Sequence, residues 1–168
     1  LDHSPRSAAL LRQVRALVPY SKTFYFVDKG KQRGLSYEYM LLFEDVLNKK
    51  LKTGNLQLHV VPMPMPPDLL LPSLQAGKTD LAIAQLTITP ERQKLVDFSA
   101  PTRRSVNEVV VTGPGEPPVA SAEDLSGRQV FPRKTSSYYE SLQALNGRLK
   151  AKNKPPVDIQ EASESLED

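Results

Sequence analysis

The segment from Gln85 to Arg92 places amide, hydroxyl and guanidinium groups directly after an apolar run at residues 80–86. If that run is a strand of an open α/β sheet, its carboxyl end faces the crevice in which such sheets bind ligands. Arg92 carries a planar fork of donors that matches a carboxylate, and Thr87 adds a hydroxyl nearby. These groups would form a clamp for an anion, and they do not form a nucleophile with its base.

Thr89 and Pro90 are of the types preferred at the N-cap and at the first position of a helix. A helix that begins here would point its free backbone N–H groups at the same ligand. We therefore expect Thr89 to cap the turn and Thr87 and Arg92 to contact the ligand. The alternative is that Arg92 only pairs with a surface carboxylate, such as that of Glu91 or Asp97, and spacing alone favours neither interpretation.

A second polar turn, at residues 134–137, lies between a predicted strand at 128–132 and a predicted helix at 138–152. Its candidates for ligand contact are Thr135 and Ser136. Simple helix capping also explains this turn, and for this turn taken alone capping is the favoured interpretation. Because the two turns flank a Gly- and Pro-rich segment at 113–118, together they predict a ligand held between two lobes that close on it.

Apolar periodicity and turn residues predict the elements that position these turns. Strands are expected at residues 14–20, 24–27, 56–61, 80–86, 107–112, 128–132 and 156–160, and helices at 36–51, 68–76, 121–125 and 138–152. Ser36 is the expected N-cap of the first long helix, and Asp45 and Lys49 are expected to pair on its surface. A hairpin is expected with its turn at residues 29–31. Four prolines at residues 62–67 are expected to end the preceding strand, because proline cannot sit in a sheet interior.

This alternation of strands and helices predicts an α/β fold with two lobes. The first lobe is expected at residues 1–112, the hinge at 113–118 and a partial second lobe at 119–168. Asp80 and the Asp97-Phe98 pair are expected to have structural roles in strand entry and core packing.

Composition narrows the classes of function. The 168 residues include 39% hydrophobic and 24% charged residues, as in a soluble globular protein, and no apolar run is long enough to span a membrane. The net charge of +3 is dispersed along the chain rather than clustered, so we expect no nucleic-acid partner. With no cysteine and two histidines, we expect no metal and no cofactor.

Three stretches carry a resemblance to a known family: RGLSYEYMLLFEDVL, LLPSLQAGKTDLAIAQLTITPERQKLVDFSAPT and DLSGRQVFPRKTSSYYESL. Their order and spacing, from about Val14 to Leu142, resemble the type 2 periplasmic solute-binding proteins of family 3, which bind polar amino acids. The middle stretch is the most specific. It is also similar to the amino-terminal, non-catalytic domain of F-type membrane-bound lytic transglycosylases.

The resemblance implies a type 2 periplasmic-binding-protein fold, with two lobes, mixed but mostly parallel sheets and an incomplete second lobe. It gives Arg92 the role of holding the α-carboxylate of the ligand, assisted by Thr87, with Gln85 at the preceding ligand-facing position. In the second lobe it assigns ligand contact to Thr135 and Ser136.

Several positions depart from the family pattern. Lys134 replaces the glycine of the second-lobe turn, and Pro67 stands where many members stack the ligand on an aromatic ring. Tyr20, Phe24 or Tyr25 could supply that aromatic wall instead. The acidic residue for the ligand amine and the return to the first lobe are not reached within 168 residues, so we expect a fragment.

We therefore expect a monomeric, extracytoplasmic binding module, periplasmic or on the outer face of a membrane, for a small carboxylate-bearing ligand such as an amino acid or a muropeptide. It would carry no catalytic residues of its own. Its expected partner is the permease of an ABC importer. The alternative is a non-catalytic regulatory domain of a lytic murein transglycosylase or of a sensor, with a cell-wall enzyme domain as partner.

Overall fold

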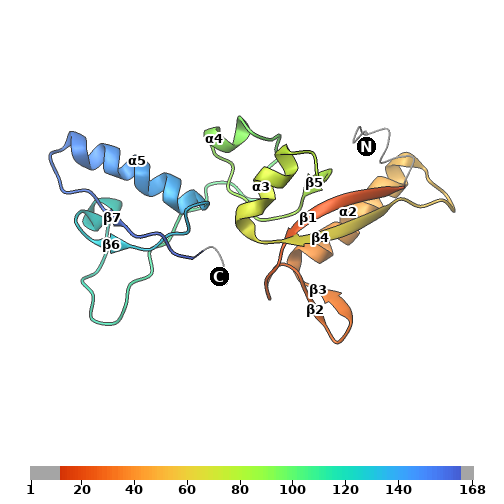
Figure 1. Cartoon of the computed structure of the whole chain (residues 1–168), viewed down its shortest axis with the longest axis horizontal. Helices are drawn as coiled ribbons and strands as arrows, with labels where there is room; N and C mark the ends of the chain where they lie inside the picture. The colour runs from red at the N-terminus through yellow and green to blue at the C-terminus, as the bar shows by residue number, and fades with distance from the viewer. Residues whose placement is uncertain (1–11, 164–168) are drawn as a thin grey trace. The chain divides into compact units, whose positions relative to one another are not determined.

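The computed structural model describes residues 12–163 (Figure 1). These residues form two compact units, one up to Asp97 and one from Phe98 onwards. The ends of both predicted lobes, at residues 1–11 and 164–168, lie outside the described range. The expected lobe boundaries at 112 and 119 stay a prediction, and each unit is described by itself.

The first unit is built on a parallel three-stranded sheet of order β4-β1-β5. Its strands are β1 (Gln13–Pro19), β4 (His59–Met65) and β5 (Leu81–Ala82). Ala16 in the central strand pairs with Pro62 on one side and with Leu81 on the other. Helices α2 (Leu35–Leu51) and α3 (Pro67–Gln75) connect these strands, so all three carboxyl ends lie at one edge of the sheet.

Strand β4 begins later than the expected residues 56–61 and continues through Pro62 and Pro64. The prediction that these prolines end the strand was wrong because β4 is the outer strand of the sheet. The N–H of His59 points inwards, to the carbonyl of Arg12, so the nitrogens of residues 60, 62 and 64 point outwards. Proline is tolerated there since no ladder hydrogen bond is lost.

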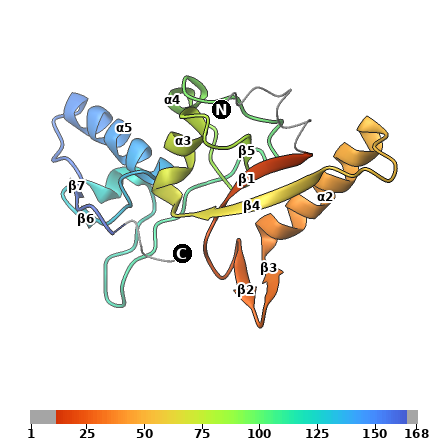
Figure 2. The same ribbon diagram turned by 45° about the vertical axis from the view of Figure 1, so that its right-hand side comes forward.

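The outward N–H of β4 that precedes these prolines is held by α2. The backbone N–H of Val60 donates to Oε2 of Glu44 at 2.6 Å. Two residues earlier, just before the strand begins, the N–H of Leu58 donates to Oδ1 of Asn48 at 2.8 Å. Figures 1 and 2 show α2 running alongside β4, as these contacts require.

Helix α2 matches the predicted range, but its cap does not. Gly34 is the N-cap, whereas Ser36 lies inside the helix and is 2% exposed. Gly34 has φ 114°, and a Cβ there would lie 2.3 Å from the carbonyl oxygen of Phe24, so only glycine fits. The expected surface pair of Asp45 and Lys49 is confirmed, with 2.6 Å between Oδ2 and Nζ.

The core of this unit lies between α2 and the sheet. Met40 packs against a cluster of side chains from the two neighbouring strands and the residue before β4: Val14, Ala16, Leu58 and Val60. The predicted hairpin is also confirmed, with β2 (Phe26–Asp28) antiparallel to β3 (Lys31–Arg33). Its turn residues Lys29 and Gly30 both have positive φ, as a tight type I′ hairpin turn needs.

The second unit packs one long helix on a parallel pair of short strands. It consists of the 3-10 helix η1 (Ala122–Leu125), β6 (Gln129–Val130), α5 (Ser137–Ala151) and β7 (Asp158–Ile159). Leu142, Leu145 and Leu149 of α5, which share one side of the predicted helix, are buried with Leu125 and Val157. The four elements confirm the predictions for residues 121–160.

Two predicted strands differ from the structure. The run at 80–86 pairs only over Leu81–Ala82, and the chain then leaves the sheet. Residues 107–112 form no strand and pair with none in the described part of the chain. Val109 and Val111 are 80% and 92% exposed, so β propensity without a neighbouring strand did not make a sheet here.

Across residues 12–163, no helix has the length and apolar character needed to cross a membrane.

Candidate functional site

The carboxyl edge of the first unit's sheet carries the residues that the sequence singled out. Tyr20 follows β1, Pro66 follows β4 and Ile83 follows β5. The N–H of Tyr20 donates to the carbonyl of Met65 at 3.2 Å, and the N–H of Ile83 donates to that of Leu17 at 2.8 Å. These bonds hold the three strand ends side by side at the edge where α/β sheets bind ligands.

The short helix α4 (Pro90–Gln93) follows this edge and begins as predicted. Thr89 is the N-cap, with an extended backbone, and its Oγ1 accepts a hydrogen bond from the N–H of Arg92 at 3.3 Å. Pro90 occupies the first helical position. The capping role of Thr89 is therefore confirmed, and the cap fixes the backbone of Arg92.

The side chain of Arg92 folds back over the segment that leaves β5. Arg92 is 6% exposed, and its Nη1 donates to the carbonyl oxygen of Thr87 at 3.3 Å. The structure thus brings Thr87, Thr89 and Arg92 together within one turn. Gln85 and Thr87 are both exposed to solvent. The backbone of Arg92 is therefore fixed by the cap, and its side chain is packed against the segment that follows β5.

The second polar turn lies in the other unit and is arranged differently. Ser136 is the N-cap of α5, and its Oγ accepts from the N–H of Tyr139 at 3.3 Å. The same hydroxyl donates to the carbonyl of Arg133 at 2.6 Å, and so does the backbone N–H of Ser136 at 3.1 Å. The capping interpretation is confirmed for Ser136. Because its O–H and N–H donors are both in use, this serine as arranged can offer a ligand only an acceptor.

Beside this cap, Thr135 is exposed and Lys134 is engaged by a carboxylate. The Nζ of Lys134 lies 2.9 Å from Oε1 of Glu161, and this hydrogen bond raises the pKa of Lys134. The lysine that replaces the family's glycine is therefore tied to the strand-like segment after β7. The assignment of Gln85, Thr87, Arg92, Thr135 and Ser136 to ligand contact stays a prediction.

Two of the three aromatic candidates for a ligand wall, Tyr25 and Tyr20, have different surroundings. Tyr25 is 5% exposed, donates its hydroxyl to Oε1 of Gln32 at 2.9 Å and meets Tyr37 edge-on at 6.5 Å between ring centroids. Burial raises the pKa of Tyr25, and Tyr37 adds to the shift. Tyr25 is thus a core residue. Tyr20, which is 59% exposed at the end of β1, is better placed to face a ligand.

Asp80, which directly precedes β5, binds Arg15 in the central strand β1. This agrees with its expected structural role at the entry to a strand. Its Oδ2 accepts from the backbone N–H of Arg15 at 2.8 Å and from Nε at 3.1 Å, and its Oδ1 accepts from Nη2 at 3.0 Å. The hydrogen bond to Asp80 raises the pKa of Arg15. The sequence analysis missed Arg15 as the partner, although an arginine inside an apolar strand was a signal that a carboxylate lies nearby.

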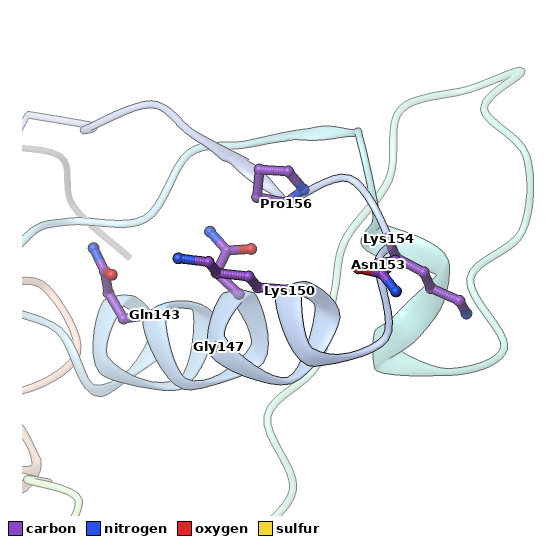
Figure 3. A pocket seen from close by; sticks show the side chains of 7 residues that line it. Gln143, Gly147, Lys150, Asn153, Lys154 and Pro156 are labelled. Atoms are coloured by element: carbon purple, nitrogen blue, oxygen red, sulfur yellow. The ribbon is translucent and has the colours of Figure 1, made fainter.

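A hollow in the second unit, between α5 and the loop that leads to β7, is structural in character (Figure 3). Asn146, one of the lining residues, donates to the carbonyl of Val157 at 3.0 Å and accepts from its N–H at 2.7 Å. At its rim, Nζ of Lys154 lies 3.0 Å from Oε2 of Glu123. These contacts fasten the loop to the helix. Among residues 12–163, no group of acidic, histidine or cysteine side chains could hold a metal ion.

Comparison with known proteins shows which family this chain belongs to. The family of bacterial extracellular solute-binding proteins, family 3, matches residues 15–156. The chain belongs to this family. This family 3 domain is therefore a solute-binding module, and the resemblance expected from its three motif stretches is confirmed.

Solved relatives confirm the expected type 2 fold. An ancestral arginine-binding protein bound to arginine aligns with TM-score 0.60 and 28% identity, covering 89% of this chain and 60% of that protein. The amino acid ABC transporter substrate-binding protein AbpA from Streptococcus pneumoniae, bound to L-arginine, aligns with TM-score 0.67 and 24% identity. Here 93% of this chain covers 61% of that protein, so the family 3 domain holds only part of the fold.

A relative of a different kind is the membrane-bound lytic murein transglycosylase F of Ectopseudomonas mendocina. It is 32% identical over 143 residues, which are 82% of this chain and 26% of that enzyme. The chain thus spans about a quarter of the length of this relative. The similarity to this group, expected from the TITPERQKLVDFS stretch, is confirmed.

Proposed function

We propose that this family 3 domain binds a small ligand that carries a carboxylate, of the amino-acid or muropeptide class, through Arg92. The observation that carries the proposal is the placement of Arg92 by the Thr89 cap at the carboxyl edge of a parallel sheet. A guanidinium carries five N–H donors in a fixed planar fork, the geometry that matches the two oxygens of a carboxylate.

The neighbouring residues supply the rest of the proposed subsite. The exposed Gln85 and Thr87 would offer an amide and a hydroxyl to polar atoms next to the carboxylate. Tyr20 would offer an aromatic face at the end of β1. From the second unit, Thr135 would contact the ligand through its exposed hydroxyl, and Ser136, whose hydroxyl is engaged as a helix cap, would add only a weak acceptor contact.

Names of relatives support the ligand class. The solved ancestral and pneumococcal relatives are described as bound to arginine. We propose that a related amino acid is the ligand here and that the module lies in the periplasm or on the outer face of a membrane. In this role it would act as a monomeric receptor whose partner is the permease of an ABC importer.

The experiment is a ligand screen on the purified protein, by thermal shift and then by calorimetry, with the common L-amino acids and with muropeptide fragments. A ligand at ~100 times its dissociation constant should stabilise the protein by ~2.7 kcal/mol. The Arg92→Ala variant should lose this shift with its circular dichroism spectrum unchanged. A protein that binds no member of either panel would contradict the proposal.

A second candidate function is a non-catalytic regulatory domain of a lytic murein transglycosylase. The observation that favours it is the match of 82% of this chain to 26% of such an enzyme, which leaves most of that enzyme outside the match. In this case catalysis lies outside these residues, and the ligand signals the state of the cell wall. Binding of a muropeptide but of no free amino acid in the same screen would select this candidate.

A further inference from the structure

The hairpin of the first unit and the turn before it concentrate positive charge. Residues 20–34 hold four of the 22 basic residues and one of the 19 acidic residues, so the rest of the chain is balanced at 18 of each. The net charge of +3, expected to be dispersed along the chain, therefore belongs to this segment between β1 and α2. Its cations are Lys22, Lys29, Lys31 and Arg33. We call these four residues the hairpin cations.

Most of the hairpin cations have no acidic partner. Arg33 is the exception, since its Nε lies 3.6 Å from Oδ2 of Asp28. Lys22, Lys29 and Lys31 are exposed and form no ion pair with any residue that the structure describes. The positive charge of this segment is therefore turned to solvent rather than neutralised within the fold.

Exposed lysines of the second unit provide a contrast. Lys152 and Lys154, in the other dense basic segment, both bind Glu123. Lys134, beside the second polar turn, binds Glu161. These lysines have a carboxylate within reach, whereas the three lysines of the hairpin segment have none in the described part of the chain. Because like charges held close together repel one another, an anionic partner would stabilise that segment.

The hairpin presents a free tip on a firm base. At the base, the hydroxyl of the buried Tyr25 donates to Oε1 of Gln32 at 2.9 Å, which fastens the two strands to the core. At the tip, a Cβ built on Gly30 would meet nothing within 4 Å. Figures 1 and 2 show the hairpin projecting from the first unit, beyond its sheet and α2. The tip can therefore meet a flat surface without obstruction from the rest of this unit.

An apolar side chain is exposed among these charges. In the hairpin register, Val27 lies opposite Gln32 and the neighbouring Asp28 lies opposite Lys31, so Val27 and Lys31 point to opposite faces. Val27 is 55% exposed. A hairpin that meets a surface tip first brings both faces into it. A combination of lysines and an exposed apolar group suits the interface of a lipid bilayer, which accepts ammonium groups at its headgroups and apolar groups just below them.

We infer that this hairpin docks the protein onto a bilayer that contains anionic phospholipids, through its three lysines and Val27. The residue types favour this partner over a single bound anion. An ammonium is a compact point charge on a flexible stem, which suits the diffuse negative potential of a headgroup layer. The one guanidinium, which could bind a single phosphate with two hydrogen bonds, is already paired with Asp28. A protruding tip also fits a flat surface, whereas a small anion needs an enclosing site.

Vesicle sedimentation of the purified full-length protein tests the inference. The vesicles are made of phosphatidylcholine alone or of phosphatidylcholine mixed with phosphatidylglycerol. We expect binding to the mixed vesicles only, and we expect it to be lost in high salt, where the Debye length falls to about 3 Å at 1 M. Absence of binding to the mixed vesicles at low salt, or equal binding to both kinds of vesicle, would overturn the inference.

Two triple variants separate the hairpin from net charge. In the first, Lys22→Gln, Lys29→Gln and Lys31→Gln should together weaken vesicle binding about a hundredfold, at about fivefold for each lysine near the surface. The control removes the same charge from exposed lysines elsewhere, by Lys50→Gln, Lys78→Gln and Lys150→Gln. It should bind within about fivefold of wild type, since these lysines lie outside the contact. Equal losses in both variants would overturn the inference.

A fluorescent label then locates the contact, and it leaves all lysines in place if the triple variant fails to fold. The chain has no cysteine, so an environment-sensitive maleimide dye at Val27→Cys reports on the hairpin. Val109→Cys is the control, at a position that is 80% exposed against 55% for Val27. Mixed vesicles should shift the dye emission to shorter wavelength at position 27 only. A shift at neither position, or at 109 alone, would overturn the inference.

Soluble polyglutamate distinguishes a bilayer from an acidic protein. If polyglutamate binds the protein more tightly than the mixed vesicles do, at equal concentration of negative charge, the hairpin is assigned to an acidic protein partner and the inference is overturned. Weaker binding of polyglutamate supports the bilayer. None of these measurements uses the ligand of the Arg92 site, so they stand independently of the proposed function.

Discussion

Thr89 and Ser136 occupy the same position in two turns of the molecule. Each is the N-cap of a helix. In each, the side-chain hydroxyl accepts a hydrogen bond at 3.3 Å from the backbone N–H of the residue three positions later. After Thr89 the helix has four residues, and the residue that the cap holds is Arg92, which is buried. After Ser136 the helix has fifteen residues, and the cap holds Tyr139 at the start of a helix anchored by core leucines.

The difference between the turns teaches what a cap can contribute to a site. Helix α4 has no long apolar face, so its cap serves mainly to orient an arginine at a strand end. Helix α5 is held by its own core, and its cap completes a structural element. Similar hydroxyl-rich sequences thus lead to a cap that orients an arginine in one unit and to a cap that completes a core-anchored helix in the other. Four variants can break or sharpen this distinction.

The largest effect is expected from Arg92→Lys. A lysine keeps the charge but loses the planar fork, so affinity for a carboxylate ligand should fall roughly tenfold to a hundredfold, as for the loss of a charge-assisted hydrogen bond worth ~1.5–3 kcal/mol. Calorimetric titration with the ligand found in the screen measures the change. The matched control is Arg33→Lys on β3, an exposed arginine 3.6 Å from Asp28. Unchanged affinity in Arg92→Lys would show that the planar fork of Arg92 does not bind the carboxylate.

Thr89→Ala should weaken binding by about fivefold, because loss of an N-cap costs about 1 kcal/mol and α4 has little else to hold it. The backbone of Arg92 would then spend less time in the binding arrangement. Thr89→Ser, which keeps the hydroxyl, should restore most of the affinity. If both variants bind like wild type, the cap does not position Arg92.

Ser136→Ala should show the opposite pattern. We expect the free energy of unfolding to fall by about 1 kcal/mol, as for other N-cap serines, while affinity changes by less than about threefold. The reason is that the hydroxyl already donates to the carbonyl of Arg133 and caps Tyr139. Chemical denaturation and titration of the same sample measure both quantities. A large loss of affinity at constant stability would show that Ser136 holds the ligand directly.

The smallest effect concerns acid stability of the second unit. Hydrogen bonds from Lys152 and then from Lys154 lower the pKa of Glu123 from 4.5 to about 2. A lowered pKa means that the carboxylate stabilises the fold above the unfolded value and that this contribution is lost as pH falls from about 4.5 towards 2. Because Glu123 is at the surface, the loss should be small and weaker in high salt.

Denaturation curves over this pH range compare wild type with Glu123→Gln. The variant should lose part of the pH dependence, whereas the control Glu116→Gln, in an exposed turn, should keep it. Parallel pH profiles for wild type and Glu123→Gln would show that the two lysines do not stabilise this carboxylate.

Local sequence signals predicted much of this architecture. Leucines at helical spacing gave the buried side of α5, and the Thr89-Pro90 pair gave the start of α4. The hairpin at Lys29 and Gly30 was likewise readable, since its turn depends on two adjacent residues. Each of these features depends on residues close together in the chain, which is the range over which residue types decide conformation.

Features that depend on distant neighbours were not readable. Pro62 lies within a strand because that strand is outermost, and residues 107–112 form no strand because none pairs with them in the described part of the chain. Gly34 replaces Ser36 as cap because the backbone of Phe24 passes close to it. At the site, the residue types indicated which hydroxyl groups are present. They could not indicate that the hydroxyl of Ser136 donates to the carbonyl of Arg133, because that depends on the fold of the turn.

The central claim is that Arg92 holds the carboxylate of the ligand, and a double cycle tests it most directly. Wild type and Arg92→Ala are each titrated with the best ligand of the screen and with the same compound as its α-carboxamide. If Arg92 grips the carboxylate, wild type prefers the acid by at least tenfold and Arg92→Ala shows almost no preference, a coupling of ~1.4 kcal/mol or more. An equal preference in both proteins would contradict the claim.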